Sequence, residues 1–282
     1  MDKPLTQPGF SKRASNLAVG TVKAFMDPDT SLRCAGTAFF GFLSLFPAIG
    51  IMVFTYGLVG DLETFTRTIA GLSAVIPEAV LDVVREQIAL LLAQPNEALS
   101  IGLVVSVVLA LWSGSRGVNA LIYAMSRVRH EAERRNFVVT LLVSVGLTLG
   151  GAVFLAVALV TVAGLPALIP FPTGGQLVLL MIRWPVLLLL TTLVLSALYR
   201  WGPDRHPREF KYIWPGAVMA SLLWLLAGAL FSIYVANFSN YQATFGSVTA
   251  AVVLLLWLYN SAQIFVLGAA FNAQLEYQSK AN

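Results

Sequence analysis

Charged residues are scarce in this 282-residue chain, and its predicted helices contain no acidic residue at all. Charged side chains make up 11% of the sequence, whereas an ordinary soluble domain has about 25%. The single cysteine, Cys34, excludes an intrachain disulfide and a cysteine metal cluster. Apolar residues reach 57%, and the mean hydropathy is +0.78. This composition excludes a water-soluble globular protein and indicates an integral membrane protein.

Sequence motifs of common enzymes are also missing. The phosphate loop GxxxxGK[ST], the zinc-binding HExxH helix and the GxSxG elbow do not occur. A nuclease needs side chains that converge on a metal, or an acid–base pair. The two histidines, His130 and His206, fall in separate predicted loops and could serve only if those loops met. We therefore predict no enzyme activity, no metal and no cofactor. We also predict no nucleic-acid partner, because the basic residues behind the net charge of +4 lie in short loops between apolar runs.

Six apolar runs are each long enough to cross a hydrocarbon core of about 30 Å as a helix. They cover residues 34–60, 98–123, 137–163, 177–198, 215–236 and 247–271. The predicted fold is all-α, with one six-helix transmembrane domain over residues 33–276. Residues 1–32 form a cytoplasmic N-terminal segment with a short interfacial helix over Asn16–Met26. An external amphipathic segment covers 61–97, and residues 277–282 form a cytoplasmic tail.

The distribution of basic residues predicts the orientation. Fourteen of the 18 Lys and Arg residues fall on one predicted side and two, Arg67 and Arg85, on the other. The positive-inside rule places the basic side in the cytoplasm, so both termini are predicted to be cytoplasmic in a bacterial inner membrane. The predicted topology anchors around helix ends are Arg116, Arg127, Arg129, Arg134, Arg135, Arg200, Arg205, Arg208 and Lys211.

Spaced aromatic, Gly and Pro residues in the last third of the chain carry a resemblance to a known family. These residues are Tyr199, Arg200, Pro203, Pro215, Gly216, Trp224, Phe231, Tyr234, Tyr241, Phe245, Gly246, Ser247, Trp257, Leu258, Tyr259, Gly268 and Asn272. Together with Ser44–Pro47, Trp112, Ser113, Arg116 and Arg135, they resemble the YihY/BrkB family of bacterial inner-membrane proteins. Older naming linked that family to ribonuclease BN. The resemblance covers most of residues 33–276 and implies a multi-pass membrane architecture rather than a defined activity.

Arg183 is the most unusual residue within the predicted spans, because it follows six apolar residues of its helix. An arginine at the centre of a bilayer costs about 2.5–3.5 kcal/mol on insertion scales. It could snorkel to the outer headgroups beside Trp184, or it could contact an anionic substrate or lipid headgroup. We place it as a candidate pathway residue that faces the interior of the bundle.

Four further candidates lie on the first and last predicted spans. Ser44 belongs to a small, weakly polar face, and Pro47 removes a backbone hydrogen bond next to it. Asn260 and Gln263, three residues apart, share one face of the last span. Close helix packing and interhelical hydrogen bonds are the alternatives to a pathway for these residues. The GxxxG spacing of Gly146 and Gly150 also predicts a close helix contact.

Three functions stay open from these residues. The first is a transporter or exporter of a small solute or lipid-like anion, because Pro47 and Pro185 interrupt corresponding spans of two oppositely oriented halves. The second is a non-transporting scaffold that supports the cell envelope. A membrane-associated ribonuclease is the third. The predicted partners are membrane lipid and an unknown solute or lipid anion, and homo-oligomerisation is left open.

Overall fold

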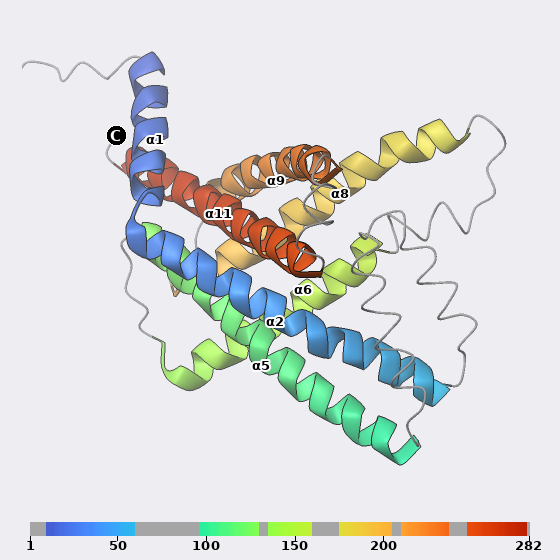
Figure 1. Cartoon of the computed structure of the whole chain (residues 1–282). Coiled ribbons are helices and arrows are strands. Elements are labelled where there is room, and N and C mark those ends of the chain that lie inside the picture. Colours follow the sequence, from blue (N-terminus) through green and yellow to red (C-terminus); the bar gives the residue numbers. More distant parts are fainter. Residues whose placement is uncertain are drawn as a thin grey trace, which may run out of the picture.

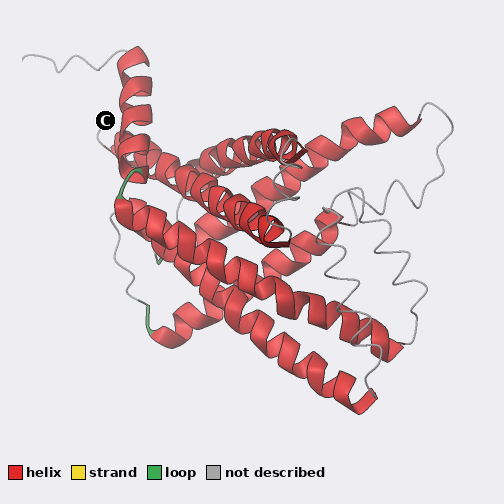
Figure 2. Cartoon of the chain, viewed as in Figure 1, coloured by secondary structure: helices red, strands yellow, loops and turns green. Residues whose placement is uncertain are grey.

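The chain folds into helices, as the apolar runs predict. The structure is a computed structural model, and it describes residues 10–59, 96–129, 135–159, 175–204, 210–236 and 247–280. Within these ranges every regular element is helical, with short loops between them (Figure 2). The helices are α1 (Phe10–Phe25), α2 (Pro28–Val59), α5 (Asn96–Val128), α6 (Phe137–Leu159), α8 (Gly175–Trp201), the short 3-10 helix η2 (Phe210–Tyr212), α9 (Trp214–Ala236) and α11 (Ser247–Lys280).

Six of these helices are long and apolar enough to cross a membrane, which confirms the predicted all-α, six-span class. The first span starts earlier than predicted because Asp27 caps it. The Asp27 carboxylate accepts a hydrogen bond from the backbone N–H of Asp29 at 3.1 Å. Pro28 occupies the first helical position, where its missing N–H costs nothing. The external segment predicted over 61–97 lies outside the described residues up to residue 95, and α5 begins at Asn96.

The six spans pack as a ring of neighbours. The order of contact is α2, α5, α6, α8, α9, α11 and back to α2, while α11 also touches α5. In Figure 1 the helices gather at the end that carries α1 and the C-terminus, and they splay apart towards the opposite end. We call the gathered end the base. It contains the starts of α2, α6 and α9 and the ends of α5, α8 and α11.

The base holds the buried core of the protein. Its large apolar side chains with almost no exposed surface include Ile122, Met125, Leu195, Ile213 and Val266. Many side chains nearer the splayed end are exposed, which is typical of helices whose outer surface faces lipid. The tertiary structure is therefore fixed mainly at one end of the bundle.

Polar side chains connect α8, α9 and α11 across this base. The Tyr199 hydroxyl on α8 donates a hydrogen bond of 2.7 Å to the Phe265 carbonyl on α11. The Asn272 side chain on α11 donates to the Ile213 carbonyl and accepts from the Gly216 N–H, both at 2.8 Å. Hydroxyl and amide groups buried in hydrocarbon need hydrogen-bond partners. The bonds of Tyr199 and Asn272 therefore fix the register between α11, α8 and α9.

Glycine allows α9 and α11 to cross closely. A Cβ atom placed on Gly268 would lie 2.7 Å from the Cβ of Ala220 and 2.8 Å from the Gly216 carbonyl oxygen. The described residues do not show the close contact predicted from the GxxxG spacing in α6. Among the described residues, no atom comes within 4 Å of a Cβ placed on Gly146 or Gly150. Close approach is decided by which face of a helix meets a neighbour, and the spacing alone does not carry that information.

Acidic residues inside helices are a second difference from the sequence prediction. α11 continues nine residues beyond its predicted end, so Glu276 lies within it, and Asp29 and Glu97 lie in the first turns of α2 and α5. Glu276 is buried and forms an ion pair of 2.9 Å with Arg129, just after α5. This pair stabilises the extension of α11 past the apolar run.

Candidate functional site

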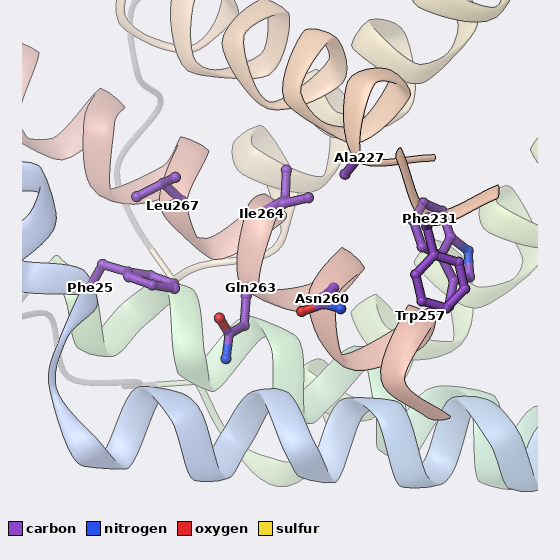
Figure 3. A pocket seen from close by; sticks show the side chains of 8 residues that line it. All are labelled: Phe25, Ala227, Phe231, Trp257, Asn260, Gln263, Ile264 and Leu267. Carbon is purple, nitrogen blue, oxygen red and sulfur yellow. The ribbon is translucent and has the colours of Figure 1, made fainter. Parts of the chain in front are cut away.

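A cavity of about 310 Å³ lies along α11, between α9 and the end of α1. Figure 3 shows the side chains around it, with Asn260 and Gln263 pointing from α11 to the side on which α2 lies. Its walls are otherwise apolar. The lining residues are Phe25, Ala227, Phe231, Trp257, Asn260, Gln263, Ile264 and Leu267. We call this cavity the lateral groove.

The lateral groove lies on the outward face of α11. Asn260, Gln263 and Leu267 recur at spacings of three and four, so they share one face of the helix. Ala262 and Val266 are buried on the other side, against the core of the base. Asn260 is exposed and Gln263 is half-buried. The two amides therefore lie on the side of α11 that faces away from the core of the base.

Tilted aromatic rings in close contact form the wall of the groove at the end where Trp257 lies. The rings of Phe231 and Trp257 lie 5.1 Å apart, and those of Trp224 and Trp257 lie 5.7 Å apart. The indole N–H of Trp224 donates a hydrogen bond of 2.9 Å to the Ser261 hydroxyl, which holds Trp224 against α11. Such packed rings make a preformed apolar surface, since few side-chain rotations remain open to them.

Asn260 and Gln263 are the two predicted pathway residues that the structure brings together. Ser44 lies on α2, where its hydroxyl donates a hydrogen bond of 2.7 Å to the Gly41 carbonyl of the same helix. Pro47 lies inside α2, one turn further on. Neither residue lines the groove. The α2 face that contains Gly41 packs on α11 instead, because a Cβ on Gly41 would lie 3.7 Å from Leu258.

Arg183 belongs to the first half of α8, and Pro185 lies two residues later in the same helix. The side chain of Arg183 lies outside the described part of the structure. α8 packs against α6 and α9. The pairing of Arg183 with Pro47, Asn260 or Gln263 therefore stays a prediction.

The predicted topology anchors have several distinct environments. Arg127 pairs with Asp27 at 2.9 Å, and Arg135 donates hydrogen bonds to three successive carbonyls, those of Trp201, Gly202 and Pro203, and to Asp204. Arg129 is buried against Glu276. Arg116, Arg200 and Lys211 are exposed. Arg134, Arg205 and Arg208 lie outside the described residues, as do His130 and His206.

Arg129 and Arg135 do more than mark an orientation. Each connects two segments at the base, which the loop positions did not predict. The sequence offered one signal for such a pairing. Glu276 is an acidic residue just after the last apolar run, on the same predicted side of the membrane as two basic loops. In the described part of the chain, no group of three or more His, Cys, Asp or Glu side chains is placed to hold a metal ion.

Comparison with known proteins gives one family over nearly the whole chain. Residues 21–282 match the family model described as Virulence factor BrkB. The chain is 32% identical over 258 residues to "Putative ribonuclease-like protein YfkH" of Bacillus subtilis (strain 168), covering 88% of this chain and 90% of that protein. It is 24% identical over 276 residues to UPF0761 membrane protein PSHAa0171 of Pseudoalteromonas translucida (strain TAC 125), covering 95% and 86%.

Shorter matches point the same way. The chain is 34% identical over 95 residues to UPF0761 membrane protein IL2447 of Idiomarina loihiensis, which covers 34% of this chain and 33% of that protein. No solved structure matches the chain. The resemblance seen in the sequence is thus confirmed. With six membrane-crossing helices and a family match from residue 21 to residue 282, this protein belongs to the BrkB family of membrane proteins.

Proposed function

We propose that this protein binds an amphipathic, lipid-like molecule in the lateral groove and moves it across the membrane. The observation that carries the proposal is the pair of amides, Asn260 and Gln263, on the outward face of α11 inside an aromatic-walled cavity. An apolar cavity with a small number of placed polar groups is the usual form of a small-molecule site.

The amides select the polar part of the occupant. Each amide offers two N–H donors and one carbonyl acceptor. In a hydrocarbon environment such groups are costly when they lack partners. Hydroxyl, ester and phosphodiester oxygens of a lipid-like anion would satisfy Asn260 and Gln263, while Phe231, Trp257 and Leu267 contact its apolar part. A volume of about 310 Å³ is near the lower limit of ligand cavities. It fits a headgroup with its glycerol or a single acyl segment.

The route into the groove is sideways from the lipid. The base is filled by Met125, Leu195, Tyr199 and Val266, all with almost no exposed surface. This packing disfavours a straight aqueous path through the centre of the bundle. Transport by this protein therefore needs a conformational change after lateral binding, and a lipid-soluble substrate suits such a route better than a small hydrophilic solute.

We also propose that the base faces the cytoplasm in a bacterial inner membrane. Arg127, Arg129 and Arg135 lie at the base, as do Arg200 at the end of α8 and Lys211 in η2. Such an excess of basic residues at one side of the spans favours the cytoplasmic side.

Flux of a fluorescent-headgroup phospholipid in proteoliposomes tests the transport proposal. Removing both amides with Asn260→Leu and Gln263→Leu takes away two hydrogen-bonding groups worth about 1 kcal/mol each, so we expect flux to fall about 30-fold. Thr55→Val is the matched control. Thr55 is exposed on α2, and its hydroxyl bonds only to the Ile51 carbonyl of its own helix. It should leave flux unchanged.

Two results would contradict the proposal. Equal flux in the wild type and the double variant would remove the groove from the pathway. Wild-type proteoliposomes that move labelled lipid, and a panel of small solutes, no faster than empty liposomes would favour the scaffold instead.

A further inference from the structure

α1 has an orientation unlike that of the six spans. In Figure 1 it stands across their direction at the base, next to the C-terminal end of α11. It packs on α11, where a Cβ on Gly20 would lie 2.8 Å from the side-chain oxygen of Gln274. Thr21 on this packed side is buried, and its hydroxyl bonds to the Leu17 carbonyl of the same helix. α1 is therefore held on the base by one face.

The opposite face is apolar and exposed over the last two turns of α1. Val19, Val22 and Met26, the last being the residue that follows the helix, recur at spacings of three and four. Their exposed fractions are 64%, 50% and 72%. A row of large apolar side chains is unfavourable in water, but it suits the boundary between headgroups and acyl chains.

The charge of α1 is entirely positive. Lys12, Arg13 and Lys23 lie within the helix, and its 16 residues include no acid. By its position in the helix, Lys23 lies next to the exposed row, and it is itself exposed. A basic helix with one apolar face is the sequence type that binds anionic membrane surfaces.

Two other features place α1 at the edge of the membrane. The first span begins at Pro28, three residues after α1 ends. Trp201 and Trp214, at the base ends of α8 and α9, are both exposed large aromatics. Tryptophan prefers the membrane–water interface. The exposed row of α1 thus lies within a few residues of the start of the first span, which favours lipid over a soluble protein as its occupant.

We infer that α1 lies in the plane of the membrane and binds the anionic leaflet that surrounds the base. Val19, Val22 and Met26 enter the boundary between headgroups and acyl chains. Lys12, Arg13 and Lys23 attract anionic headgroups to this position. The inference does not depend on transport, because it concerns where α1 lies and which lipids gather there.

Quenching of a fluorophore by labelled lipid in proteoliposomes tests this inference. The probe is attached to Val22→Cys in a variant without the native Cys34. The same probe on Tyr277→Cys is the control, since Tyr277 is exposed near the C-terminal end of α11 and follows the apolar run predicted over residues 247–271. The vesicles mix phosphatidylcholine and phosphatidylglycerol, and the quencher is carried on one or the other. We expect quenching at residue 22 and little at residue 277. At residue 22 the quencher on phosphatidylglycerol should be preferred about fivefold, the effect of one basic residue at an anionic surface.

Replacing Lys12, Arg13 and Lys23 by Gln should remove this preference and leave quenching by both lipids. Equal quenching by the two lipids in the unreplaced chain would overturn the anionic selectivity. Water access at residue 22 equal to that at residue 277 would overturn the location itself. Efficient cross-linking between two copies through Val22→Cys would assign the surface to a second copy of the chain instead.

Discussion

Breaking the buried ion pair between Arg129 and Glu276 should destabilise the base more than any change at its surface. The two side chains are 2% and 11% exposed and lie 2.9 Å apart. Glu276→Gln removes the carboxylate charge that faces the Arg129 guanidinium, and breaking a buried ion pair by removing one partner costs about 3–5 kcal/mol. Arg129→Met removes the other partner of the ion pair and should cost a similar amount. Replacing both with Met removes both charges, and such exchanges are often close to neutral.

Reversible unfolding of the purified protein in mixed detergent–SDS micelles, followed by tryptophan fluorescence, measures these free energies. Arg127→Gln is the matched control. Its guanidinium pairs with Asp27, but it is 50% exposed, so its loss should cost at most about 1 kcal/mol. The reasoning fails if Glu276→Gln costs no more than the control. It also fails if the double variant loses the sum of the two single losses, because the two charges would then not be coupled.

Four more predictions follow from particular residues. Gly268→Ala should destabilise the protein by about 1–3 kcal/mol in the same unfolding assay because of overpacking, whereas Gly146→Ala, which meets open space, should be neutral or stabilising by up to about 1 kcal/mol. An impermeant thiol reagent added outside cells should label Ala93→Cys but not Tyr277→Cys, and the reverse pattern would invert the orientation. Arg183→Lys should lower lipid flux, because an ammonium cannot make a bidentate contact with phosphate; unchanged flux would assign Arg183 to snorkelling. Purified protein free of contaminating nucleases should not cleave RNA with or without divalent metal, and cleavage lost on replacing either histidine would contradict this.

The amino-acid sequence alone determined the fold class and the six spans. Length and apolar composition are sufficient, because only a helix satisfies its own backbone inside lipid. Helix ends were less well predicted. The polar side chains of Gln274 and Glu276 predict a tail, but α11 continues through both residues. In the folded protein Gln274 packs on Gly20, and Glu276 pairs with Arg129.

The lateral groove shows where sequence reasoning stops. The spacing of Asn260 and Gln263 put both amides on one face, and the structure brings them into one cavity. Their outward direction could not be predicted, because apolar residues occur all round α11 and lipid is as apolar as a protein core. The pairing of Arg129 with Glu276, 147 residues apart, was equally hidden. Local sequence sets which segments become helices, but only packing between them decides which faces meet and which charges become buried.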